Sequence, residues 1–181
     1  WTHPQTLPDS RLVSIMRDDD ATFGIVHSRF HELWSLRLGG RHGVGNDPQY
    51  TPSLGFETFP FPKGMFPNIP AADLVDEPKG QAIAAAAKTL NEQRESWLNP
   101  PELVKRIPEV VTGFPDRIIP IDEAAIQVLK DRTLTKLYNA RPAWLQHAHA
   151  VLDQAVAAAY GWPVDISDDD ALARLLALNM E

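Results

Sequence analysis

The stretch from Thr22 to Pro62, TFGIVHSRFHELWSLRLGGRHGVGNDPQYTPSLGFETFPFP, joins a helical pattern to a polar loop with a proline-rich end. Apolar residues recur in its first part at the three- and four-residue spacing of one helix face: Phe23, Val26, Phe30, Leu33, Trp34 and Leu38. The pattern predicts a single amphipathic helix that begins at the acidic triplet Asp18 to Asp20 and ends before Gly39.

The segment after this helix combines glycines with hydrogen-bonding side chains. Residues 41–55 are predicted to be a loop. Residues 56–62 are predicted to be extended, because a proline disfavours the α region for the residue before it. Side chains able to contact base edges or phosphates gather in this loop: Arg41, His42, Asn46, Asp47, Gln49, Tyr50, Thr51 and Ser53. On composition alone, a solvated loop without a ligand is the simpler interpretation.

The remaining segments are predicted to be mostly helical. Residues 11–17 form a short strand candidate, and residues 63–79 look like a proline-containing linker with little periodicity. Helical spacing favours helices over residues 80–98 and 122–139, from Pro142 to Gly161, and after Ser167, separated by a proline-broken stretch at 99–121. The fold class is therefore α+β, mainly α, with a helical bundle over residues 80–181.

Composition limits the function. The 181 residues contain no cysteine, which excludes disulfides and thiolate metal sites, and no apolar run approaches the length of a membrane span. The net charge of −7 argues against an autonomous nucleic-acid binder. Residues 1–70 carry −1 of this charge and residues 71–181 carry −6, so a face that meets phosphates is expected in the first part. Because the chain begins at Trp1 rather than Met, we interpret it as a piece of a longer protein.

Several motifs have a structural explanation as well as a chemical one. His27 and His31 are spaced to share a metal ion on a helix, yet Ser28 stands where a metalloprotease has Glu and no third ligand is evident. Asn99-Pro100-Pro101 resembles the catalytic motif of amino-group DNA methyltransferases, but Glu102 replaces the aromatic residue that stacks on the flipped base. Packing of the histidines and a helix stop at Asn99 are the preferred interpretations.

Three strings carry a resemblance to a known family: FGIVHSRFHELWSLRLG, GVGNDPQYTPS and FETFPFP. They resemble the end of the target-recognition domain of MmeI-like DNA methyltransferases, the single-chain type IIL restriction–modification enzymes. The downstream strings LNEQRESWLNPPE, TLTKLYNARPAWLQHAHAVLDQAVAAAYGWP and DDDALARLLALN are similar to the C-terminal segment of the same proteins. The resemblance covers nearly the whole chain.

The resemblance implies a parent enzyme that transfers methyl from S-adenosylmethionine to N6 of adenine in a short DNA sequence. It places the cofactor loop and the catalytic motif upstream, so this chain is expected to have no catalytic residue, no metal and no cofactor of its own. It divides the chain into the end of the recognition domain (1–62), a linker (63–79) and a C-terminal helical domain (80–181). The implied partners are double-stranded DNA and the methyltransferase domain, the implied location is cytoplasmic, and no membrane is involved.

The base-contacting candidates under this resemblance are Arg41, His42, Asn46, Asp47, Gln49 and Tyr50. Two other function classes remain open at this point. One is a helical protein-interaction module with no role in DNA binding. The other is a metal-dependent hydrolase built on His27, His31 and an acidic triplet.

Overall fold

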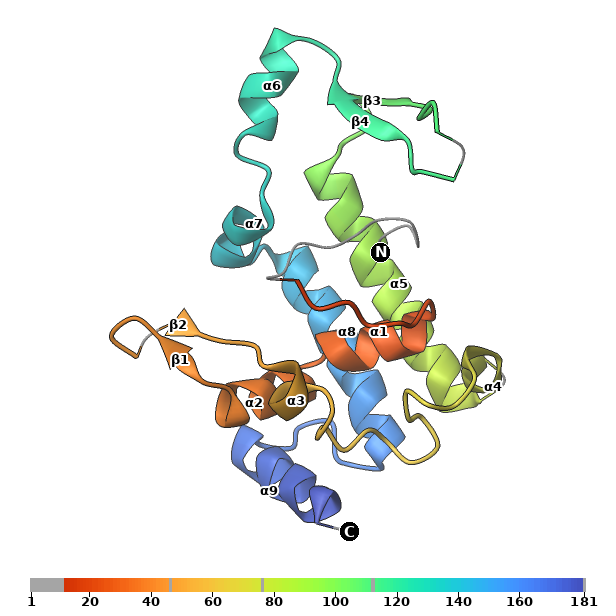
Figure 1. Ribbon diagram of the computed structural model, residues 1–181, viewed down its shortest axis with the longest axis vertical. Helices are drawn as coiled ribbons and strands as arrows, with labels where there is room; N and C mark the ends of the chain where they lie inside the picture. Colours follow the sequence, from red (N-terminus) through yellow and green to blue (C-terminus); the bar gives the residue numbers. More distant parts are fainter. Residues whose placement is uncertain (1–11, 46, 76, 112, 181) are drawn as a thin grey trace. The chain divides into compact units, whose positions relative to one another are not determined.

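The computed structural model describes residues 12–45, 47–75, 77–111 and 113–180. Within them the chain is mainly helical, with nine helices and two small two-stranded antiparallel sheets (Figure 1). This confirms the predicted fold class of α+β, mainly α. None of the described helices is both long enough and apolar enough to cross a membrane.

The chain forms two compact units. The first unit contains residues 1–15 and 89–147, and the second contains residues 16–88 and 148–181. The chain passes from one unit to the other within α5 (Pro78–Leu98) and within α8 (Ala143–Tyr160). The predicted boundaries, with the recognition segment ending at residue 62 and the helical domain beginning at residue 80, concern function, and they stay a prediction.

The second unit contains the whole stretch from Thr22 to Pro62. Its elements are α1 (Asp20–His27), α2 (Arg29–Leu38), β1 (Arg41–His42), β2 (Asp47–Pro48), α3 (Pro52–Gly55), α4 (Ala71–Val75), the first part of α5, the second part of α8, and α9 (Asp168–Asn179). Residues 63–79, predicted as a linker, contain α4 and two buried side chains, Met65 and Leu74.

The prediction of one continuous helix over residues 20–38 is wrong, because the helix is broken at Ser28. Ser28 is extended (φ −76°, ψ 157°), and its hydroxyl donates to the Ile25 carbonyl at 2.7 Å. The Asp153 carboxylate on α8 accepts the Arg29 amide at 2.9 Å and so caps α2 from another helix. No local pattern encodes this cap, since its acceptor lies 124 residues away.

The predicted strand at residues 11–17 is also wrong over its described part, since residues 12–17 belong to no strand. Instead, Arg17 lies against the start of α1, where it pairs with Asp19 at 2.7 Å and donates to the Pro67 carbonyl at 3.1 Å. Asp19 also accepts the Thr22 amide at 2.6 Å. The acidic triplet therefore caps α1, as predicted.

A close approach at Gly24 holds the core of the second unit together. A Cβ at this position would lie 2.7 Å from Ile83 Cγ2, 2.9 Å from Ala87 Cβ and 3.1 Å from Leu152 Cδ1. Ile83, Ala87 and Leu152 are fully buried. Only glycine lets α1 pack this closely on α5 and α8.

The first unit contains β3 (Val104–Ile107), β4 (Arg117–Pro120), α6 (Glu123–Leu129) and α7 (Leu134–Ala140). The antiparallel pair runs from Val104↔Pro120 to Ile107↔Arg117 inside the stretch that was predicted to be proline-broken. The predicted helix over 122–139 is divided into two, because Asp122 caps α6 and Thr133 caps α7 through their side chains. In the second unit, the Ser167 side chain caps α9, the helix predicted after Ser167.

Candidate nucleic-acid interface

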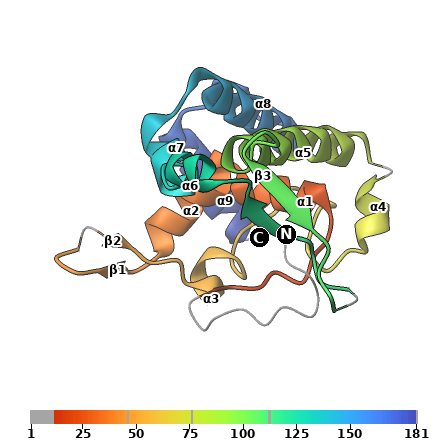
Figure 2. The same ribbon diagram turned by 90° about the horizontal axis from the view of Figure 1, so that it is seen from above.

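The loop that follows α2 is a β-hairpin. Strands β1 and β2 pair Arg41 with Pro48 and His42 with Asp47, and the Gly45 amide donates to the His42 carbonyl at 3.1 Å. Gly43 and Gly45 have positive φ values of 65° and 90°, which suit glycine in a tight turn. Figures 1 and 2 both show this hairpin extending beyond the helices of its unit.

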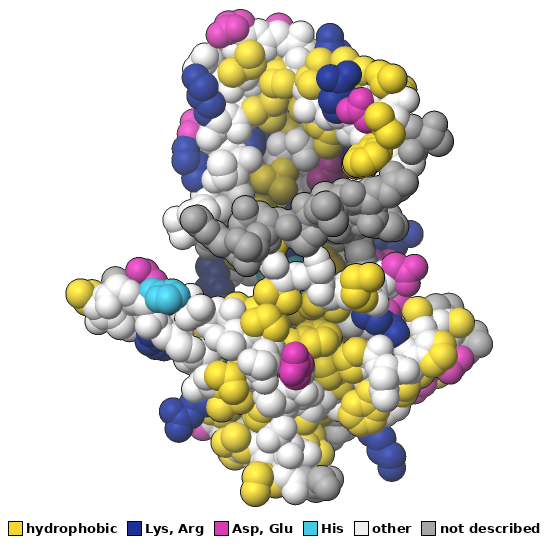
Figure 3. Space-filling model, viewed as in Figure 1, with side chains coloured by type: hydrophobic (Ala, Val, Ile, Leu, Met, Phe, Trp, Pro, Cys, Tyr) yellow, Lys and Arg dark blue, Asp and Glu magenta, His cyan; other side chains and the backbone are white. Residues whose placement is uncertain are grey.

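The structure brings most of the predicted base-contacting residues onto this hairpin. Arg41, His42, Asp47 and Gln49 are exposed, and Tyr50 is 38% exposed. Asn46 lies outside the described residues. Figure 3 shows the basic, acidic and imidazole side chains of this region on the protruding part of the surface, and Val44 at the turn is 96% exposed. The predicted residues thus share one protrusion whose side chains face solvent.

The base of the hairpin is fixed by a close backbone contact. The Gln49 amide donates to the Gly40 carbonyl at 2.8 Å, which closes the hairpin directly after α2. A Cβ on Gly39 would lie 2.6 Å from the Gln49 carbonyl oxygen. The Gly39-Gly40 pair, predicted only as a helix stop, therefore also lets the two ends of the hairpin meet.

Tyr50 connects the hairpin to a buried histidine. Its hydroxyl donates to His31 Nε2 at 3.3 Å, while His31 Nδ1 donates to the Val26 carbonyl at 3.0 Å. Burial lowers the pKa of His31, with backbone hydrogen bonds to Val26 and Gly55 opposing that shift, and burial raises the pKa of Tyr50. A neutral His31 with its proton on Nδ1 can donate to the Val26 carbonyl and accept from the Tyr50 hydroxyl.

Helix α3 adds a second attachment that the sequence reasoning missed. The Trp34 indole N–H lies 3.2 Å from both the Leu54 carbonyl and the Thr58 hydroxyl, and the side chain is 1% exposed. A Cβ on Gly55 would lie 3.0 Å from the Tyr50 ring. The Thr51-Pro52 dipeptide, with proline at the first helical position, was a signal for this helix.

The segment Phe59-Pro60-Phe61-Pro62, which follows the loop, is attached to other parts of the second unit. Phe59 contacts His31 edge-to-face with ring centroids 5.0 Å apart, and it contacts Phe61 at the same distance. The Tyr160 hydroxyl donates to the Pro60 carbonyl at 2.8 Å, and the Asn179 amide donates to the Thr58 carbonyl at 2.7 Å. We call His31, Trp34, Tyr50, Phe59 and Phe61 the aromatic anchor of the hairpin.

The histidine pair does not gather a metal-ligand set in the described part of the chain. There, no three His, Asp or Glu side chains lie close enough to share a metal ion. His27 Nδ1 bonds to the Phe23 carbonyl at 2.9 Å, and the two histidines lie on different helices because of the break at Ser28.

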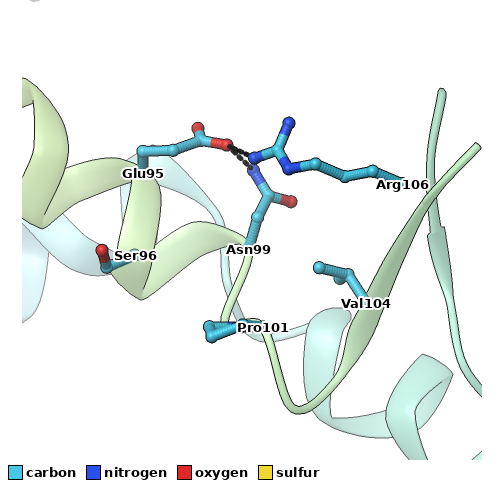
Figure 4. Close-up of a pocket in the computed structure, with 6 residues that line it drawn as sticks. All are labelled: Glu95, Ser96, Asn99, Pro101, Val104 and Arg106. Carbon is cyan, nitrogen blue, oxygen red and sulfur yellow. Dashed lines mark hydrogen bonds and ion pairs between the residues drawn. The ribbon is translucent and has the colours of Figure 1, made fainter. Parts of the chain in front are cut away.

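The Asn99-Pro100-Pro101 motif borders a cavity of about 330 Å³ in the first unit (Figure 4). The Asn99 amide donates to the Glu95 carboxylate at 3.1 Å, and Arg106 pairs with the same carboxylate oxygen at 2.9 Å. The Asn99 amide nitrogen is thus engaged at the end of α5, and the Leu103 amide bonds to the Pro100 carbonyl in the turn that follows. These contacts fit the predicted role of a helix stop and a proline corner.

Comparison with known proteins connects these features to a family. Residues 1–63 match the family model described as "MmeI, target recognition domain". This confirms the resemblance inferred from the sequence for that part of the chain. No curated protein matches the sequence.

The fold is also similar to that of a solved structure described as "Structure of Type IIL restriction-modification enzyme MmeI in complex with DNA has implications for engineering of new specificities". The TM-score is 0.55 and the sequence identity 21%. The match covers 90% of this chain and 16% of that protein's chain, so this chain spans about a sixth of its length.

Proposed function

We propose that this chain is the DNA-reading end and C-terminal scaffold of a cytoplasmic, S-adenosylmethionine-dependent N6-adenine DNA methyltransferase of the restriction–modification type. The β1–β2 hairpin contacts base edges of double-stranded DNA. The chain itself does no chemistry, and its partners are the DNA and the methyltransferase domain of the longer protein. The helices after residue 80 brace the recognition segment.

One observation carries this proposal. A hairpin with exposed polar side chains is attached to an aromatic anchor whose members other than Tyr50 are buried, within the segment that matches a target-recognition family model. Base recognition requires donors and acceptors held at defined positions, because a bidentate contact to one base discriminates by about 1–3 kcal/mol only when its geometry is kept. The anchor supplies this rigidity from beneath the hairpin.

The side chains of the hairpin suit base edges. Arg41 can donate two hydrogen bonds to guanine, and Gln49 can pair with adenine through its amide. Asp47 can accept from a cytosine amino group, and His42 and Tyr50 add donors near the backbone. Asn46, by its type, is a further candidate for adenine.

The experiment is methylation-site mapping in cells that express the full-length protein or its variants. Arg41→Ala/Gln49→Ala should relax or abolish the modified motif while leaving S-adenosylmethionine binding intact. The matched control is Lys63→Ala/Asn68→Ala, which removes an exposed cation and an exposed amide of the same unit outside the hairpin. An unchanged motif in the hairpin variant would contradict base reading by these residues and would favour a protein-interaction module.

A further inference from the structure

The β3–β4 hairpin in the first unit is a second ribbon that the proposed function does not use. Its strands pair from Val104↔Pro120 to Ile107↔Arg117, and of the residues that connect them the structure describes 108–111 and 113–116. In Figures 1 and 2 this loop lies at the end of the ribbon away from α6 and α7.

The stem of this ribbon is braced on its own unit. Arg106 on β3 pairs with Glu95 on α5 at 2.9 Å, and Asn99 donates to the same carboxylate (Figure 4). The Ile121 amide donates to the Leu103 carbonyl at 3.0 Å and extends the ladder beyond the strands. The stem is therefore held in place while the loop at its end projects.

The loop exposes apolar side chains. Val110 is 88% exposed, Val111 57% and Phe114 40%, and Gly113 turns the chain with a φ of 92°. Three exposed apolar side chains within five residues at the end of a ribbon are typical of an interaction surface.

Basic side chains lie on the stem beside this apolar tip. The strand register puts Lys105 and Arg117 on one face of the ribbon, since Lys105 shares a face with Ile107 and Ile107 pairs with Arg117. Among the described residues, Lys105 makes no ion pair, and the Arg117–Glu109 pair at 3.2 Å is partly open to solvent. Lys105 is therefore available to a phosphate, and Arg117 can exchange its partly exposed pair with Glu109 for a phosphate. Figure 3 shows apolar and charged side chains together over this ribbon.

The grouping of charge by unit does not oppose a nucleic-acid occupant of the first unit. Residues 1–15 and 89–147 carry nine Lys and Arg and nine Asp and Glu, so the whole net charge of −7 falls on the second unit. The acidic C-terminal residues thus belong to the second unit, and the unit that bears this ribbon is neutral. Residues 104–120 contain three basic and two acidic side chains.

We propose that the β3–β4 hairpin is a second DNA contact, which inserts Val110, Val111 and Phe114 into the minor groove while Lys105 and Arg117 hold the flanking phosphates. The inference rests on the proposed function, because it assumes that the longer protein binds DNA. Minor-groove proteins insert apolar wedges between base steps, partly unstack them and bend the duplex. An apolar tip alone would suit a protein partner equally, and the basic stem favours DNA.

The test uses the full-length protein and a duplex that carries its mapped methylation motif, with 2-aminopurine in the base steps around the motif and a fluorophore pair at the duplex ends. Wild-type protein should raise 2-aminopurine fluorescence and bend the duplex. Val110→Ser/Val111→Ser/Phe114→Ser should lose both signals and weaken binding about tenfold, with the methylated motif unchanged. Lys105→Gln/Arg117→Gln should lower the slope of log affinity against log salt by about 2.

The matched control for the tip is Ile126→Ser/Val128→Ser, which removes exposed apolar side chains from α6 of the same unit and should behave as wild type. Wild-type bending and affinity in the tip variant would overturn the insertion alone. A tip variant that binds DNA normally but loses contact with the methyltransferase domain would overturn it in favour of a protein partner. A wild-type protein that binds no DNA would overturn the proposed function as well.

Discussion

Replacement of Gly24 by alanine has two opposite effects on stability, and their sizes can be compared. Helix propensity alone predicts a gain of about 1 kcal/mol, because alanine is the better helix former. The new Cβ, however, would lie 2.7 Å from Ile83 Cγ2 and 2.9 Å from Ala87 Cβ. Ala87 Cβ is fixed by the backbone of α5, and Ile83 Cγ2 can move only by leaving the χ1 rotamer that isoleucine strongly prefers in a helix. Overpacking of a filled core costs about 1–3 kcal/mol. We expect Gly24→Ala to lower the free energy of unfolding by up to about 2 kcal/mol.

Urea titration followed by tryptophan fluorescence would measure this change. The control is Gly24→Ala combined with Ala87→Gly, which removes the methyl group that the new Cβ would contact. The double variant should show a favourable coupling energy, since its two changes act on one contact. A rise in stability for Gly24→Ala alone would refute the close approach of α1 to α5.

Three further perturbations test other parts of the second unit. Burial raises the pKa of Asp153 to about 6 from 3.8, so its contribution to stability is present below about pH 4 and is lost as the pH rises through 6. Asp153→Asn removes this titration. The free energy of unfolding of the variant relative to wild type, measured by urea titration, should therefore rise by up to about 3 kcal/mol between pH 4 and 7. A difference that does not change with pH would contradict the buried carboxyl. Tyr50→Phe removes the donor to His31 and should cost about 1 kcal/mol of unfolding free energy by the same assay, whereas no cost would remove this hydrogen bond from the anchor. Ser167→Ala removes the cap of α9 and should cost about 1 kcal/mol, with loss of amide exchange protection at Asp170; unchanged protection would argue against the cap.

The parts of the fold that local chemistry determines were predictable. Asp19 and Ser167 cap helices through side chains three residues before the amides that they accept, and such patterns are visible in the sequence. The apolar spacing of residues 80–98 likewise predicted α5, which spans Pro78–Leu98. In these elements the decisive contacts lie within one turn of helix.

The errors came from contacts between distant residues. The break at Ser28 depends on Asp153, and the β3–β4 pair joins two segments whose prolines argued against strands. Pro120 is compatible with its strand because a two-stranded ribbon leaves one side of each strand unpaired, where no backbone donor is required. Residues 12–17 have strand-like composition but gain no partner strand, so composition alone could not form one.

In the candidate interface too, local features were predictable from the sequence and contacts between distant residues were not. The sequence identified the polar residues of the hairpin, because glycine, charge and amide side chains are visible without a fold. It did not show that the aromatic anchor residues lie together, since Tyr50 and Trp34 form hydrogen bonds with partners that lie 19, 20 and 24 residues away in the sequence.

The anchor and the hairpin differ in a way that bears on how recognition could change between related proteins. Four of the anchor side chains, His31, Trp34, Phe59 and Phe61, are buried, whereas the hairpin side chains Arg41, His42, Asp47 and Gln49 are exposed. Surface substitutions at such positions usually change stability by less than about 0.5 kcal/mol, while loss of a buried ring costs several times more. The exposed side chains of the hairpin can therefore be exchanged at little cost to the fold. If the proposed function holds, the recognised sequence can change through these exposed residues while the buried residues keep the geometry of the hairpin.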